Sequence, residues 1–65
     1  MIMPKKVREL IKELKKAGFV DRGGKGSHRN FKHPNGGEIV ISGQLGSDAL
    51  KYQLRDVKKA IDEVQ

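Results

Sequence analysis

The chain has no cysteine and no tryptophan, and only three of its 65 residues are aromatic. Without cysteine, no disulfide can stabilise the fold and no thiolate can bind zinc. With two histidines and scattered carboxylates, we expect no metal site and no cofactor. No apolar run approaches the roughly 20 residues that span a bilayer, and no signal-peptide pattern opens the chain. These absences predict a cytoplasmic protein without a membrane partner.

Positive charge is what the chain has in excess. Fourteen lysines and arginines against eight acidic residues give a formal charge of +6. Residues 5–16 hold six cations and two anions, whereas residues 48–65 hold four of each. No carboxylate occurs from Arg22 to Gly37. This uneven distribution indicates a basic face for an anionic partner such as nucleic acid, the alternative being an ordinary solvated surface.

Apolar periodicity predicts a helix at each end of the chain. The first helix is expected from Pro4 to Ala17, with proline in its first turn and Gly18 just past its last. The start of the closing helix is left open between a cap at Ser47 and a later start near Tyr52. Its expected apolar stripe consists of Leu50, Leu54, Val57, Ile61 and Val64.

Three short strands are expected between these helices. They are Phe19–Arg22, His28–Lys32 and Glu38–Ser42, separated by a loop at Gly23–Ser27 and a turn at His33–Gly37. The order α-β-β-β-α predicts a single α+β domain over residues 1–65, a three-stranded antiparallel sheet with two helices on one face. Double-stranded-RNA-binding domains share this element order, an analogy of fold alone.

The central segment carries the candidate site. If side chains alternate across the second strand, Phe31 and Arg29 face the core side, and His28, Asn30 and Lys32 face solvent. The glycine-rich loop before the strand can bring backbone N–H groups close to phosphate oxygens. The expected RNA-binding residues are Lys25, Gly26, Ser27, Arg29, Asn30 and Lys32.

His28 is the candidate for proton transfer, because imidazole ordinarily titrates near neutral pH. Cleavage of a phosphodiester without a metal needs an internal nucleophile, and the RNA 2′-hydroxyl is one. His28 could accept that proton or protonate the leaving oxygen, while Lys25 and Arg29 stabilise the phosphorane. An exposed histidine without a role is the alternative. His33 lies in a turn on the opposite parity, so a pair of catalytic histidines is not favoured.

At Lys25–His28 the chain resembles the HicA family of toxin ribonucleases. The resemblance extends over Val7–Lys12, Ala17–Phe19, the Gly26-Ser27-His28 motif, Phe31 and the turn His33–Gly36. It implies a double-stranded-RNA-binding-like fold, endoribonuclease activity on mRNA, a catalytic role for His28, and neutralisation by a HicB-type antitoxin. Many members carry proline and histidine after the third strand, where this chain reads Ile41-Ser42-Gly43-Gln44.

Two functions remain open at this point. The first is a toxin that cleaves mRNA without a metal, using His28 as general acid or base. The alternative is a non-catalytic RNA-binding module of the same fold, holding phosphate by charge and reading shape. A DNA-binding or adaptor protein is disfavoured because no helix-turn-helix pattern occurs.

Overall fold

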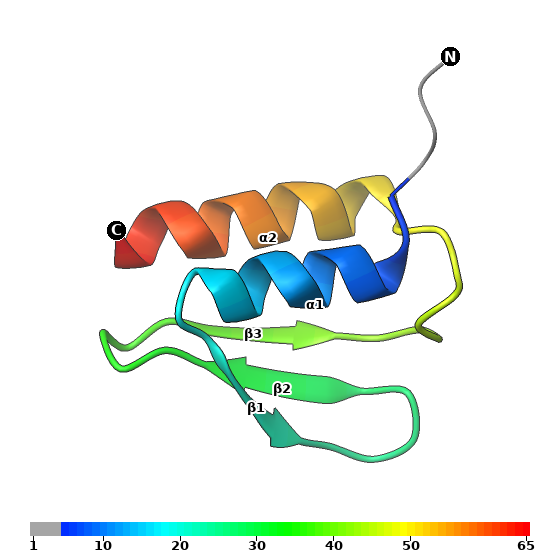
Figure 1. Cartoon of the computed structure of the whole chain (residues 1–65), viewed down its shortest axis with the longest axis horizontal. Coiled ribbons are helices and arrows are strands. Elements are labelled where there is room, and N and C mark those ends of the chain that lie inside the picture. Colours follow the sequence, from blue (N-terminus) through cyan, green and yellow to red (C-terminus); the bar gives the residue numbers. More distant parts are fainter. Residues whose placement is uncertain (1–4) are drawn as a thin grey trace.

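The computed structural model describes residues 5–65. Its elements are helix α1 (Val7–Lys16), strands β1 (Val20–Gly23), β2 (Arg29–Lys32) and β3 (Glu38–Ile41), and helix α2 (Lys51–Val64). The strands form one antiparallel sheet in chain order, and both helices cover the same face of it (Figure 1). The predicted α+β architecture is confirmed. Within the described residues, neither helix combines the length and apolarity needed to cross a membrane.

The core lies between the sheet and the two helices. Phe31 is fully buried at the centre of β2, where it pairs with Ile39 of β3. The apolar stripe of α1 packs onto it as predicted. The buried core residues are Val7, Leu10, Ile11, Leu14, Phe19, Phe31, Ile41, Val57, Ala60 and Val64.

The end of α1 agrees with its prediction from sequence. Gly18 has φ +103°, which favours glycine because it has no Cβ. The N–H of Gly18 donates to the carbonyl of Lys15 at 3.0 Å, and that of Phe19 donates to Leu14 at 2.9 Å. This pair of bonds is a Schellman motif, which satisfies the last carbonyls of the helix and turns the chain toward β1.

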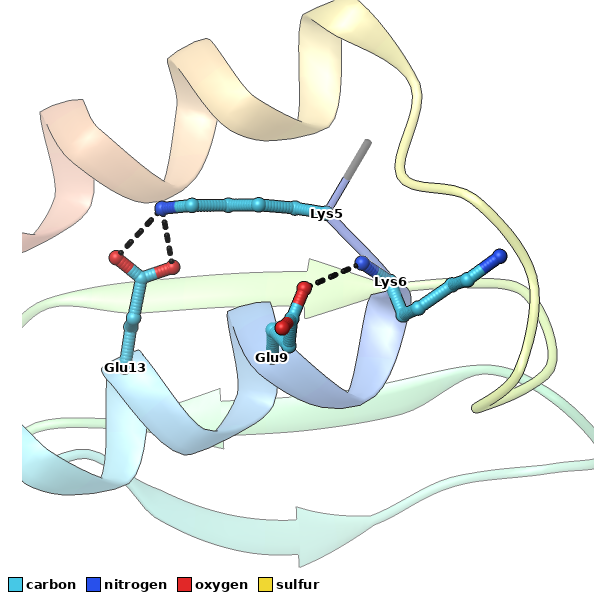
Figure 2. A network of polar contacts seen from close by, with 4 residues as sticks. All are labelled: Lys5, Lys6, Glu9 and Glu13. Carbon is cyan, nitrogen blue, oxygen red and sulfur yellow. Dashed lines mark hydrogen bonds and ion pairs between the residues drawn. The ribbon is translucent and has the colours of Figure 1, made fainter. Parts of the chain in front are cut away.

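The start of α1 differs from its prediction. Pro4 lies outside the described residues, and the helix begins at Val7 because Lys6 is extended, with φ −92° and ψ 156°. The Lys6 N–H donates to the Glu9 carboxylate at 2.8 Å (Figure 2). Lys5 lies alongside the helix and its Nζ donates to both carboxylate oxygens of Glu13 at 3.0 Å. Side-chain contacts of Glu9 and Glu13 with Lys6 and Lys5 therefore stabilise the helix start.

The strand limits move by one residue from those expected. β1 begins at Val20, because Phe19 turns into the core and is only 3% exposed. β2 begins at Arg29, which leaves His28 at the end of the preceding loop. A register shift between Asp21 and Gly23 interrupts the β1–β2 pairing.

The closing helix starts at Lys51, with Leu50 extended as its N-cap. Its buried face differs from the predicted stripe, because Leu50 is 56% and Leu54 37% exposed. Gln53 takes the inward position instead and is only 5% exposed. The buried positions of α2 are Gln53, Val57, Ala60 and Val64. The helix is thus rotated from the orientation that apolarity alone predicts.

Candidate functional site

The loop between β1 and β2 positions His28 at its end. The His28 N–H donates to the Lys25 carbonyl at 3.0 Å, which closes a turn over Lys25–His28. Gly24 lies so close to this turn that a Cβ there would stand 2.0 Å from the His28 carbonyl oxygen. The Asn30 amide donates to the Gly23 carbonyl at 3.1 Å and ties the start of the loop to β2. The loop conformation is therefore held by these hydrogen bonds, and it requires glycine at position 24 because any side chain there would collide with the His28 carbonyl.

The predicted alternation along β2 is confirmed. Phe31 has no exposed surface, whereas His28, Asn30 and Lys32 are exposed. Arg29, on the side of Phe31, is half-buried. The structure thus puts Asn30 and Lys32 on the open face of the sheet, away from the helices, as the parity argument requires, and leaves His28 exposed at the end of the loop that leads into β2.

Two of the predicted RNA-binding cations have carboxylate neighbours. Arg29 lies 3.5 Å from Asp21 of β1, and Lys32 lies 3.3 Å from Glu38 of β3. The sequence shows no carboxylate within the segment itself, and strand pairing supplies both from its neighbours. The Lys32–Glu38 pair is exposed and contributes little to stability, whereas the Arg29–Asp21 pair is partly buried. Of the three predicted RNA-binding cations, Lys25 alone makes no salt bridge within residues 5–65, so its charge is open to an incoming phosphate.

The two histidines have different environments. The Asn35 N–H donates to Nδ1 of His33 at 3.0 Å, so Nδ1 is unprotonated, and Nε2 then donates to the Ala17 carbonyl at 3.0 Å. The ring also packs edge-on against Phe19, with centroids 5.0 Å apart. His33 therefore joins the β2–β3 turn to the end of α1. Within the described residues, the His28 imidazole has no hydrogen bond to protein, and it remains available to a ligand.

We expect His33→Ala to lower the free energy of unfolding by about 2 kcal/mol, because two hydrogen bonds of roughly 0.5–1.5 kcal/mol each are lost. Each kcal/mol lowers the melting temperature of so small a domain by about 4–8 °C, so thermal melting followed by circular dichroism measures this effect. His28→Ala is the matched control, with an expected melting temperature close to that of the unmodified chain. Equal melting temperatures for the two variants would contradict the structural role of His33.

A hollow opens between two glycine-containing loops at the same end of the sheet. One wall comes from the β1–β2 loop and β2, and the other from the loop between β3 and α2. The hollow has a volume of about 460 Å³ and is lined by Gly26, Ser27, Arg29, Gly43, Gln44, Leu45 and Gly46. The sequence argument missed the second wall, although the run Gly43-Gln44-Leu45-Gly46, a leucine and a glutamine between two glycines, was a signal for it. Among residues 5–65, no three His, Cys, Asp or Glu side chains group as metal ligands.

Residues 7–62 match the family described as the HicA toxin of bacterial toxin–antitoxin systems. The chain belongs to the HicA toxin family. The match begins at the first residue of α1 and ends two residues before the end of α2, so it includes the sheet and both loops of the hollow. A comparison with curated proteins gives no match. As a HicA-family member, the protein is a toxin of a toxin–antitoxin system, and it has an antitoxin as its partner.

Proposed function

We propose that this HicA-family toxin is an endoribonuclease that cleaves mRNA without a metal, with His28 as general acid or base. The observation that carries the proposal is the contrast between the two histidines. Both ring nitrogens of His33 are bonded to backbone groups, whereas His28 is exposed and has no hydrogen bond to the described protein. An exposed imidazole beside a cationic, glycine-rich loop has the chemistry for proton transfer next to a phosphate.

The reaction proceeds by attack of a ribose 2′-oxygen on the adjacent phosphorus. The P–O5′ bond breaks, the 2′-hydroxyl loses its proton, and the departing 5′-oxygen gains one. His28 performs one of these two proton transfers, and solvent completes the other. Lys25 and the N–H groups of Gly26 and Ser27 stabilise the negative charge on the crowded phosphorus. The products are a 2′,3′-cyclic phosphate and a 5′-hydroxyl.

The products and a modified substrate test this chemistry. We expect cleaved RNA to carry 5′-hydroxyl ends, and cleavage to continue in excess EDTA. An oligonucleotide with a 2′-O-methyl group at the cleaved ribose should remain intact, because it lacks the nucleophile, and the unmodified oligonucleotide is its control. Cleavage of DNA, or 5′-phosphate ends, would contradict the proposal.

The second candidate is a toxin that binds RNA without cleaving it. This candidate is favoured by the two backbone hydrogen bonds of the His33 ring, because they leave only the His28 imidazole for two proton transfers. Under this alternative, His28→Ala would leave both RNA binding and toxicity unchanged. Under the endoribonuclease proposal, the variant binds RNA and loses toxicity.

We further propose that the antitoxin is of the HicB type and covers Lys25 and His28. A partner with acidic groups would complement the exposed Lys25 ammonium and associate faster at low salt. Hydrogen exchange of the complex tests this, with protection expected over residues 23–32. Protection confined to α2 would rule out direct occlusion.

A further inference from the structure

The loop between β3 and α2 is held at both ends by one buried side chain. Gln53 is 5% exposed, and its Nε2 donates to the Ser42 carbonyl at 2.8 Å. Its Oε1 accepts a bond from the Leu50 N–H at 2.9 Å. Ser42 and Leu50 stand on either side of the loop, so the Gln53 amide fixes the distance that the loop must span.

The N-terminal end of α1 holds the middle of the same loop. The Val7 N–H donates to Ser47 at 2.9 Å, and the Arg8 N–H donates to Leu45 at 3.2 Å. Free N–H groups at a helix start need such acceptors, and here the loop carbonyls supply them. An ion pair between Lys6 and Asp48 adds to this attachment. In Figure 2 the Lys6 side chain extends away from Glu9, whose carboxylate accepts from the Lys6 backbone.

These restraints leave Gln44 and Leu45 exposed on a loop that is otherwise bonded to the fold. Leu45 is 43% exposed, although its carbonyl is held by α1. Both residues face the hollow opposite Gly26, Ser27 and Arg29. The two loops emerge at the same end of the sheet (Figure 1). The hollow, about 460 Å³ in volume, is open to solvent, which suits one base of a strand that passes over the surface.

Resting on the proposed function, we propose that this hollow receives one unpaired base of the RNA, next to the bond that His28 helps to cleave. Leu45 packs against the face of the base, and the Gln44 amide bonds to its edge. Unpaired RNA bases are read through such apolar contacts and edge hydrogen bonds, and glutamine offers both a donor and an acceptor. Ser27 and Arg29 line the hollow, and His28 lies between them in the chain, although its own side chain is not part of the lining. An RNA strand that crosses this point of the backbone can therefore put one base in the hollow and a neighbouring phosphate at His28.

The pre-formed loop makes Gln44 a specificity-determining residue. An amide on a restrained loop discriminates between bases, because a mismatched base leaves its donor or acceptor unpaired. A bidentate amide favours adenine, whose edge presents a donor beside an acceptor. The protein therefore cleaves with a preference at one position beside the scissile bond, and Gln44 sets that preference.

Mapping of cleaved ends on a transcript of mixed sequence tests the role of Gln44. For Gln44→Ala, we expect cleavage at the preferred sites to fall about tenfold relative to other sites, so that the sequence preference flattens. Gln65→Ala is the matched control, because Gln65 is exposed at the opposite end of the molecule (Figure 1). An unchanged distribution of cleavage sites in Gln44→Ala overturns the proposal.

A binding measurement separates this inference from the proposed function. Short single-stranded RNA is titrated into the inactive His28→Ala variant while the side-chain amide signals of Gln44 and Gln65 are followed by NMR. A shift confined to Gln44 supports the base site, even if the unmodified toxin cleaves no RNA and the proposed function fails. An unmoved Gln44 signal overturns it. The base-site proposal is also overturned if Gln44→Ala loses antitoxin binding but keeps the cleavage pattern, because the hollow then binds the antitoxin.

Discussion

His28→Ala is expected to lower the rate of RNA cleavage by about 10²–10⁴-fold, the usual contribution of a general acid or base. The side chain is exposed and within residues 5–65 makes no hydrogen bond, so its removal leaves no core cavity and the fold should persist. Cleavage of a fluorescent RNA by purified protein gives the rate, and growth after induction in cells gives the toxicity. RNA binding should remain, since the Lys25 charge and the loop backbone are unchanged.

Lys58→Ala provides the control for the loss of His28. Lys58 is also exposed but lies on α2, in the helical layer away from the open sheet face (Figure 1). We expect this variant to cleave RNA like the unmodified toxin. Undiminished cleavage by a folded His28→Ala protein would remove His28 from the reaction. The circular dichroism spectrum of each variant establishes that it is folded.

Phe31→Ala is expected to have the largest effect on folding. Phe31 has no exposed surface and lies at the centre of the sheet face that the helices cover. Truncation of a buried phenylalanine costs about 3–5 kcal/mol, whereas a chain of 65 residues has a total stability of roughly 3–10 kcal/mol. The variant should therefore be largely unfolded or melt at least about 12 °C lower, as thermal and urea denaturation would measure.

Val40→Ala tests the opposite face of the same sheet. Val40 pairs with Asn30 of β2 and is 57% exposed. Its truncation should change the free energy of unfolding by no more than about 0.5 kcal/mol. If instead Phe31→Ala melted like the unmodified protein and Val40→Ala were strongly destabilised, the alternation along β2 would be reversed. His28 would then face the helices, and a catalytic role on the open face would be lost.

The helix and strand order could be predicted from sequence because each element has a local signal. The stripe of α1 recurs every three to four residues, and Gly18 ends it with a positive φ. Alternation in β2 was enough to separate buried Phe31 from exposed Asn30 and Lys32. These signals depend on neighbours within about one turn or two strand positions, and tertiary contacts did not override them.

The orientation of α2 could not be predicted in the same way. A stripe through Leu50 and Leu54 is the more apolar choice, yet Gln53 is buried and the two leucines are exposed. The Gln53 amide bonds to Ser42, eleven residues earlier, and to the N-cap of its own helix. A buried amide is tolerated because its donor and acceptor are both satisfied, and apolar periodicity contains no information on that pairing.

The candidate site likewise has features that the sequence predicts and features that only the tertiary structure determines. The basic glycine-rich segment, His28 and the exposed side of β2 follow from the order of residues alone, because charge, flexibility and alternation are local properties. Only the tertiary structure pairs Arg29 with Asp21, commits His33 to Ala17 and Asn35, and brings Gln44 opposite Ser27. Most of these contacts join residues that lie on different elements. They depend on strand register and on how the loops fold back, and these are set by the packing of the whole core.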